Sequence, residues 1–327
     1  MEEPLLKIIG LNKTFGKRKV LKNINFEIYP KEILGVIGES GVGKTTLLNA
    51  IVGFIKPEKG DILFRQLDVI SNGKNAVYKS VYKNQSKFKD IYGFAAQSPS
   101  FYEKLTVREN LEYFGKLYKL SKETLKSNIA TLLKLMNLEE YKDTLGKSLS
   151  GGMERRLDIA CSLIHNPKLL LLDEPTADLD PVLRNNIWKL ISKIASSGTT
   201  IILSSHYLAD LEDLCSRIAI IKDGEVIDID TPEALKIKFD SDNMIVVKTY
   251  PGNYEKLALS ISNKMKKVIK NCQKERLGLV IKCTKPNLIL DEVIKTIEKD
   301  NENIIEIKIV KPTLDEVFIA LNENSAK

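Results

Sequence analysis

The sequence predicts an α/β domain with a largely parallel sheet, followed by a smaller α+β domain of ferredoxin-like order. Over residues 1–230, strand-like segments alternate with helix-like segments, as they do in parallel-sheet domains. Thr231-Pro232 is typical of a helix start, and after it the order of elements becomes βαββαβ. With 327 residues, of which 43% are hydrophobic, the chain is long enough to give each domain its own core. We place the domains at residues 1–235 and 236–327.

The first domain shows two kinds of strand pattern, one with alternating apolar and polar residues and one that is continuously apolar. Ile24, Phe26 and Ile28 alternate with polar residues, which indicates a half-buried strand, whereas residues 33–37 form a short apolar run that leads straight into glycines. Asp223-Gly224 between two apolar segments is a strong hairpin signal. The expected strands are residues 24–28, 33–37, 169–172, 199–204, 217–221 and 225–229.

Helical patterns separate these strands. Residues 45–53 predict a helix that Gly53 ends, and the pattern stays mainly helical from about residue 98 to residue 166. Because the fully apolar run at residues 169–172 then returns to a strand, we interpret this long stretch as a helical subdomain inserted into the sheet domain.

The second domain also combines strand-like and helix-like segments, which are shorter. One helix carries an apolar stripe at Leu290, Val293, Ile294 and Ile297, and Thr313 to Glu316 form a capping box that opens a final helix. We expect strands at residues 244–250, near Val268, at 279–284 and at 304–310, and helices at residues 253–265 and 287–299.

Bulk charge argues against a nucleic-acid partner. The net charge of +7 is spread along the chain, whereas nucleic-acid proteins concentrate their basic residues on one face. The densest basic cluster is interpreted as a solvated helix face; it consists of Lys264, Lys266, Lys267 and Lys270.

Cysteine usage and hydropathy point to the cytoplasm. Cys161, Cys215, Cys272 and Cys283 lie far apart without a Cys-x-x-Cys pair, which favours reduced, buried thiols. No run approaches the about 18 apolar residues that a spanning helix needs, and the residues after Met1 show no signal peptide. Any role at a membrane must therefore come through a partner.

A phosphate-binding loop lies between the second expected strand and the first expected helix. Its glycines let backbone N–H groups turn toward phosphates, the helix N-terminus adds partial positive charge, and Lys44 supplies a full charge to the outer phosphates. The hydroxyl of Thr45 is suited to Mg²⁺. The nucleotide-contacting run is Gly38-Glu39-Ser40-Gly41-Val42-Gly43-Lys44-Thr45-Thr46.

Two acids end the apolar strand at residues 169–172. A carboxylate at the end of a buried strand can hold the Mg²⁺ shell while its neighbour faces the attacking water. We assign Asp173 to the metal and Glu174 to the role of general base. By itself such a pair could equally cap a following helix, but the phosphate loop makes the catalytic interpretation the better one.

Leu149-Ser150-Gly151-Gly152, between the phosphate loop and the acidic strand, resembles the signature of ABC ATPases. The resemblance covers residues 5–229 and implies an ABC cassette with a helical subdomain. It implies an adenine-stacking role for Phe15, a switch role for His206, and a role for Gln97 in joining Mg²⁺ to the helical subdomain. Residues 177–180 resemble the loop that faces a second copy.

The sequence departs from the usual signature at Met153, which stands where glutamine is common. This form, followed by Arg155 and Arg156, resembles the subfamily that exports drugs, lipids or polysaccharides with ATPase and permease on separate chains. Residues 312–318 resemble the closing helix of that subfamily's accessory domain. The resemblance implies a peripheral subunit on the cytoplasmic face of the membrane, whose partners are ATP, a permease and a second copy of the chain.

In the family, two copies face each other head to tail. ATP held by Lys44 and Thr45 of one copy is therefore expected to be covered by Ser150, Gly151 and Gly152 of the other. Closure is expected to drive the permease, and hydrolysis to reopen the pair.

Two other functions fit the sequence less well. A soluble ABC-type ATPase of ribosomes or DNA would carry two cassettes or a long heptad coiled coil, and this chain shows one cassette and no sustained heptads between Lys44 and Ser150. A non-catalytic nucleotide sensor fits less well because Lys44, Asp173, Glu174 and His206 are all present. The transported substrate is not encoded in these motifs.

Residues 72–89 are longer than the family usually has at this place. We expect a solvated helical excursion, with contact to anionic lipid headgroups beside the permease as the alternative. The segment carries Lys74, Lys79, Lys83, Lys87 and Lys89 with Tyr78 and Tyr82.

Overall fold

The computed structural model describes residues 2–66, 76–206, 208–239, 243–266, 268–275, 278–283, 285–310, 313–316 and 318. The chain divides into unit 1, Met1–Thr231, and unit 2, Pro232–Lys327. The division falls at the start of helix α8 (Pro232–Phe239), whereas the sequence expectation placed it after Leu235. Within the described residues, no helix is both long and apolar enough to cross a membrane.

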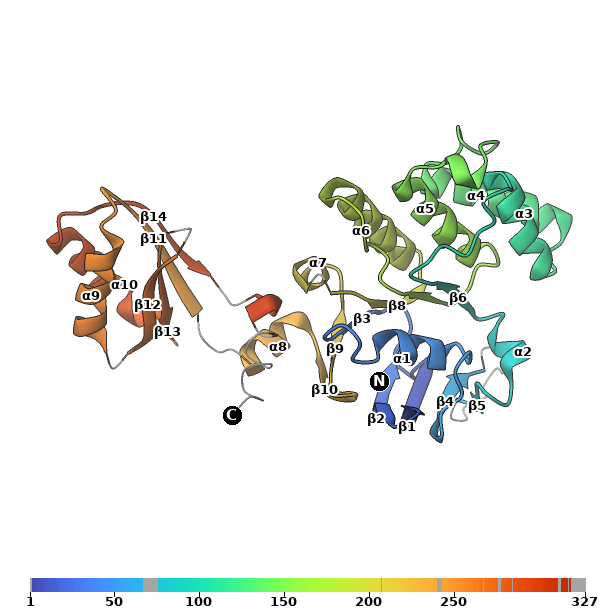
Figure 1. Cartoon of the computed structure of the whole chain (residues 1–327), viewed down its shortest axis with the longest axis horizontal. Coiled ribbons are helices and arrows are strands. Elements are labelled where there is room, and N and C mark those ends of the chain that lie inside the picture. The colour runs from blue at the N-terminus through green and yellow to red at the C-terminus, as the bar shows by residue number, and fades with distance from the viewer. Residues whose placement is uncertain are drawn as a thin grey trace. The chain divides into compact units, whose positions relative to one another are not determined.

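A six-stranded sheet forms the centre of unit 1, in the order β10-β9-β3-β8-β7-β6 (Figure 1). All neighbouring strands are parallel except the β9–β10 hairpin. Every residue of β3, β7 and β8 is buried, because both faces of a parallel sheet are covered. The predicted parallel sheet is therefore confirmed. The strands are β3 (Ile33–Ile37), β6 (Tyr92–Ala95), β7 (Leu169–Leu172), β8 (Thr200–Ser204), β9 (Arg217–Lys222) and β10 (Glu225–Asp230).

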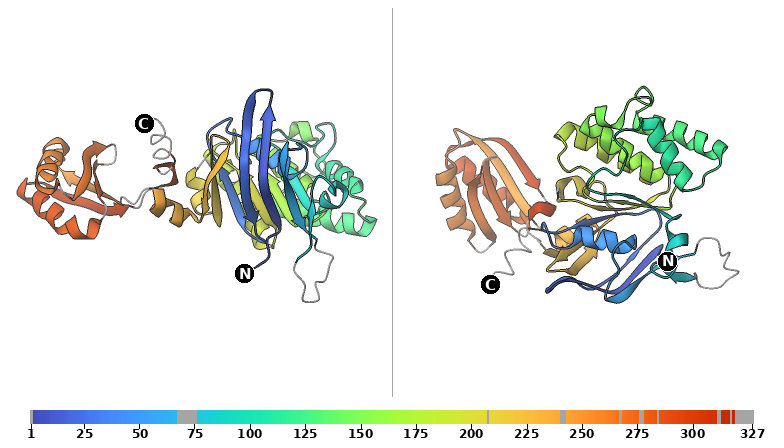
Figure 2. Two further views of the ribbon diagram at one scale, coloured as in Figure 1. Left: turned by 90° about the horizontal axis from the view of Figure 1, so that it is seen from below. Right: turned by 45° about the vertical axis from the view of Figure 1, so that its right-hand side comes forward.

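A second, antiparallel sheet shares a core with the first. Its order is β2-β1-β4-β5, and the long β1–β2 hairpin is the dark blue element of Figure 2. Helix α1 (Lys44–Ile51) contributes Leu47, Leu48 and Ile51 to the core that both sheets form. This packing fixes the start of α1, and with it the phosphate loop, against the β3 end. The strands are β1 (Leu6–Phe15), β2 (Arg18–Ile28), β4 (Lys59–Arg65) and β5 (Tyr78–Ser80).

The helical subdomain lies where the sequence predicted it. Thr106 caps its first helix through a capping box with Glu109: the Thr106 Oγ1 accepts from the Glu109 amide at 3.2 Å, and the Glu109 carboxylate accepts from the Thr106 amide at 2.8 Å. Ser150 precedes the third helix. The helices are α3 (Val107–Leu117), α4 (Lys122–Met136) and α5 (Gly151–Leu163), with α6 (Pro181–Ser196) and the shorter α2 (Gln85–Phe88), η1 (Gly146–Ser148) and α7 (Leu208–Glu212) elsewhere in unit 1.

The expected solvated helix at residues 72–89 is wrong for its described part. Residues 78–80 form the edge strand β5, and only Gln85–Phe88 is helical. The tyrosines anchor the segment: Tyr82 Oη donates to the Ala50 carbonyl at 2.9 Å, and burial raises the pKa of Tyr78 to about 12. Lys83, Lys87 and Lys89 are exposed, and Lys74 lies outside the described residues.

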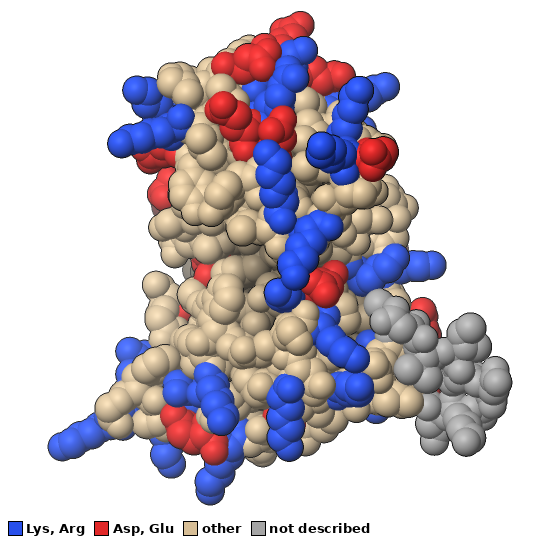
Figure 3. Space-filling model, turned by 90° about the vertical axis from the view of Figure 1, so that its right-hand side faces the viewer, with Lys and Arg blue, Asp and Glu red and all other residues tan. Residues whose placement is uncertain are grey.

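Acidic side chains interrupt the basic ones on the surface that Figure 3 shows, over both its upper and lower parts. The figure displays one face of unit 1, where Lys and Arg do not merge into a single continuous patch. This mixture agrees with a net charge spread along the chain.

Unit 2 has the predicted ferredoxin-like fold. Its antiparallel sheet has the order β12-β13-β11-β14, and α9 and α10 bury their apolar stripes in one core with it. Thr313 and Glu316 form the predicted capping box, while Lys267, Thr284 and Pro312 lie outside the described residues. The elements are β11 (Asn243–Tyr250), α9 (Tyr254–Met265), β12 (Ile269–Glu275), β13 (Gly278–Cys283), α10 (Pro286–Lys299) and β14 (Asn303–Val310).

The four cysteines are free thiols, as predicted. Cys161, Cys215 and Cys283 are buried, whereas Cys272 is half-buried.

His165 lies in the turn just after α5 ends at Leu163, close to the helix-end position that the sequence indicated. Its ring stacks on Tyr118 with centroids 3.6 Å apart, and Nε2 lies 3.0 Å from the Tyr92 carbonyl oxygen. Burial lowers the pKa of His165 from 6.5 to about 4, because desolvation disfavours the imidazolium. The folded chain therefore holds this ring neutral at pH 7.

This buried ring predicts an acid-sensitive contribution to stability. Between pH 6.5 and about 4 the unfolded chain binds a proton at His165 that the folded chain does not, so stability is complete above pH 6.5 and falls as pH drops toward 4. His165→Phe keeps an aromatic ring on Tyr118 and removes the titration. Melting temperatures measured across this range should fall more steeply for the native chain than for His165→Phe; parallel curves would contradict this account.

Candidate nucleotide-binding site

The phosphate loop leaves the carboxyl end of β3 and enters α1. Gly41 and Gly43 adopt φ of 75° and 116°, a region that L side chains rarely occupy. At Gly38 an added Cβ would stand 2.5 Å from the Ile221 carbonyl oxygen. These positions require glycine, because the backbone itself must make the cradle.

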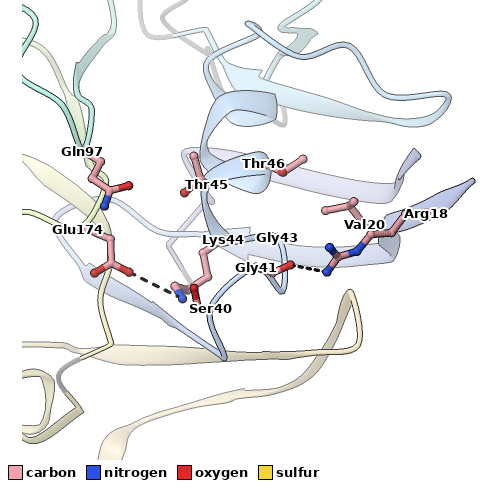
Figure 4. Close-up of a pocket in the computed structure, with 10 residues that line it drawn as sticks. All are labelled: Arg18, Val20, Ser40, Gly41, Gly43, Lys44, Thr45, Thr46, Gln97 and Glu174. Atoms are coloured by element: carbon pink, nitrogen blue, oxygen red, sulfur yellow. Dashed lines mark hydrogen bonds and ion pairs between the residues drawn. The ribbon is translucent and has the colours of Figure 1, made fainter. Parts of the chain in front are cut away.

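Lys44 lies under this loop and is only 7% exposed. Its ammonium donates to the Gly38 carbonyl at 2.8 Å and to the Glu39 carbonyl at 3.2 Å, and it stands 3.8 Å from Glu174 Oε1 (Figure 4). The charge is thus held at the edge of a cavity of about 330 Å³. The lining residues are Arg18, Val20, Ser40, Gly41, Gly43, Lys44, Thr45, Thr46, Gln97 and Glu174.

Asp173 and Glu174 follow β7, and a serine on the neighbouring strand orients both. Asp173 is 1% exposed, and its Oδ1 accepts from Ser204 Oγ at 2.6 Å. The same Ser204 oxygen accepts from the Glu174 backbone N–H at 2.9 Å. Because β7 and β8 are adjacent and parallel, their carboxyl ends bring these three residues together.

The carboxylate of Glu174 lies between Lys44 and His206. Its backbone has φ of 48°, which is unfavourable for a residue with a side chain and needs support from its surroundings. One carboxylate oxygen faces Lys44, and the other lies 2.5 Å from His206 Nδ1. Gln97 reaches the cavity beside Glu174, on the side opposite Thr45 and Thr46 (Figure 4).

Several expected site residues lie outside this cavity. Phe15 is 49% exposed at the end of β1 with Lys13 Nζ 5.2 Å from its ring centre, and it does not line the cavity. Glu39 is exposed, and Val42 packs against the core. The cavity lining also excludes Ser150, Gly151 and Gly152, which begin α5; the first two are exposed, whereas Gly152 is buried close to Leu183.

Sequence reasoning missed Arg18, Val20 and Ser204. Arg18 Nη2 donates to the Gly41 carbonyl at 2.9 Å, so it braces the phosphate loop from strand β2. The sequence shows only a basic residue just after the β1–β2 turn and does not indicate that it contacts the phosphate loop. Ser204, at the end of a predicted strand, could have been found by asking which side chain meets the acids on the next strand.

Two oxygen donors at the cavity and one beside it suit a hard divalent cation. Thr45 and Gln97 line the cavity, whereas Asp173 does not line it and directly precedes Glu174, which does. These residues supply hydroxyl, amide and carboxylate oxygens, and Mg²⁺ prefers oxygen ligands. Among the described residues, no group of three His, Cys, Asp or Glu side chains could by itself hold a metal. Mg²⁺ usually takes one or two carboxylates and completes its shell with phosphates and water.

The parallel sheet, glycine loop, buried lysine and acid-ended strand define a P-loop nucleotide hydrolase. The family described as "ABC transporter" matches residues 21–177. The chain is similar, at 32% identity over 257 residues, to Nod factor export ATP-binding protein I of Bradyrhizobium diazoefficiens, covering 79% of each chain. It therefore belongs to the ATP-binding subunits of ABC transporters, which bind and hydrolyse ATP and work with membrane permeases.

Two further comparisons extend this assignment. Linearmycin resistance ATP-binding protein LnrL of Bacillus subtilis is 29% identical over 317 residues, which cover 97% of this chain and 98% of LnrL. The solved structure of cbiO1 from Clostridium perfringens, part of the ABC transporter complex cbiONQ, superposes with a TM-score of 0.63 at 31% identity, covering 72% of this chain and 91% of that one. The predicted ABC cassette is confirmed.

Proposed function

We propose that this chain energises an exporter as a peripheral subunit on the cytoplasmic face of the membrane, bound to a separate permease. The observation that carries the ATPase part is the convergence of Lys44, Glu174 and Gln97 on one cavity. The export part rests on the nearly full-length similarity to a resistance protein and on Met153 in the signature. The alternative, an ATPase of ribosomes or DNA, has no comparable support in the cassette.

In this proposal, the loop amides and Lys44 bind the β- and γ-phosphates of ATP. Thr45, Gln97 and Asp173 would hold Mg²⁺, which neutralises charge on the phosphate oxygens when bound. Glu174 accepts a proton from the attacking water, and Ser204 keeps the neighbouring Asp173 carboxylate oriented. His206, beside Glu174, orients that carboxylate and contacts the γ-phosphate.

The exposed signature supports a shared site. Ser150 and Gly151 lie at the N-terminus of α5, where backbone N–H groups and the helix dipole favour an anion, and they do not line their own chain's cavity. We infer that they cover the ATP of a second copy placed head to tail. Closure around two ATP molecules then drives the permease, and hydrolysis reopens the pair.

A shared site makes turnover depend on encounter between copies. We expect ATPase activity per chain to rise with protein concentration, because a single copy lacks the covering signature. Steady-state phosphate release measured over a wide dilution series tests this. Constant activity per chain across the series, with no larger species on a sizing column, would mean that one copy suffices or that closure needs the permease.

A further inference from the structure

Arg155, in the second turn of α5, is a buried cation that no assigned role uses. It is 7% exposed, and its guanidinium donates to three backbone carbonyls. Nη1 donates to Ala96 at 2.6 Å, Nε to Pro175 at 2.9 Å and Nη2 to Asp173 at 3.1 Å. Three fixed donors therefore tie one helix to two separate loops.

These carbonyls belong to the residues that bracket the reacting groups. Asp173 and Pro175 stand directly before and after Glu174, whose φ of 48° needs external support. Ala96 directly precedes Gln97, the cavity residue on the loop after β6. A shift of α5 would therefore move Glu174 and Gln97 together.

The guanidinium is itself held in place. Asp158, one turn further along α5 and fully buried, lies 3.3 Å from Arg155 Nη1. The second oxygen of Asp158 accepts from the amide and hydroxyl of Ser100, at 2.8 Å and 2.7 Å. Paired buried charges with satisfied hydrogen bonds have a defined geometry, so Arg155 acts as a rigid link.

We propose that Arg155 is a positioning residue that couples the two ATP sites of the dimer, by transmitting engagement of the signature to Glu174 and Gln97 of the same chain. This inference rests on the proposed shared site. The α5 helix that begins after Ser150 would contact the second copy's ATP, while its Arg155 holds the catalytic loops facing its own ATP. Each site would then respond to occupancy of the other.

The test compares steady-state ATPase kinetics of the native chain with Arg155→Met. The native chain should show a Hill coefficient for ATP above 1. In Arg155→Met we expect kcat to fall about 10²-fold, because displacement of a reacting group by ~1 Å costs that much. Directly measured ATP affinity should stay within about twofold, because Arg155 does not line the cavity, and the Hill coefficient should fall to 1.

Two further variants separate coupling from stability. Arg155→Met combined with Asp158→Asn removes both buried charges, so it avoids an isolated carboxylate that could unfold the chain. Ser162→Ala removes a buried hydrogen bond of the same helix, from the Ser162 hydroxyl to the Ile159 carbonyl, outside the network of Arg155, and it should keep the native kcat and Hill coefficient. If the Arg155 variants match Ser162→Ala, or if the native chain is not cooperative, the coupling role is wrong.

The dimer itself is checked separately. Glu174→Gln with ATP on a sizing column reports whether two copies associate at all. A missing dimer would mean that isolated copies do not share a site, which would overturn the coupling role in the purified chain. A dimer whose cooperativity survives loss of Arg155 would remove only the coupling role.

Discussion

Replacing Glu174 by Gln is expected to lower ATP turnover about 10²-fold to 10⁴-fold, the contribution of a positioned general base. The amide has nearly the same shape as the carboxylate but cannot take a proton from water. Lys44 remains free to bind phosphate, because its other contacts are to the Gly38 and Glu39 carbonyls. ATP binding should therefore persist while hydrolysis becomes much slower.

The same variant should accumulate as an ATP-bound dimer. Phosphate release in a single turnover and elution volume with ATP measure the two effects on one preparation. Glu139→Gln, an exposed acid after α4, is the matched control and should behave like the native chain. Normal turnover in Glu174→Gln would assign the base to another group.

Replacing Lys44 by Ala should strongly weaken ATP binding. One charge-assisted contact to phosphate is worth up to about 3 kcal/mol, which corresponds to a rise in Kd of about 10²-fold. The fold should survive, because the ammonium donates to the Gly38 and Glu39 carbonyls at the edge of the cavity, where water can take its place. Calorimetric titration with ATP, beside a melting curve, measures both properties.

Lys89→Ala serves as the control, since Lys89 is exposed and does not line the cavity. If Lys44→Ala bound ATP as tightly as Lys89→Ala does, the cavity beneath the loop would not be the nucleotide site.

Local patterns predicted most of the sheet and helices. The buried run Leu169–Leu172 and the Asp223-Gly224 turn each encode their element within a few residues, because burial on two faces and positive φ leave direct marks on composition. The antiparallel sheet was not assigned in full. Strand β1 pairs on both sides with register shifts, so its residues do not alternate regularly between apolar and polar.

The site residues that belong to short contiguous motifs could be predicted from the sequence. Lys44 and Glu174 are identified by the loop and by the acid-ended strand, and the structure places them 3.8 Å apart. Ser204 and Arg155 gain their roles only from contacts across β8 and α5, which spacing does not encode. Phe15 shows the opposite relation between sequence and structure. Its position matches the family motif, but its side chain does not line the cavity.

The strand order of unit 1 constrains when the chain can fold during synthesis. Strand β3 leads into the phosphate loop, yet its two neighbours are β8 and β9, the latter ending at Lys222. A nascent chain released before Thr200 has the loop sequence but no partner on either side of β3, and one released before Arg217 still lacks β9. Such long-range pairings form slowly. We therefore expect nucleotide binding to arise late in biogenesis, and truncated products that end before β9 to lack it.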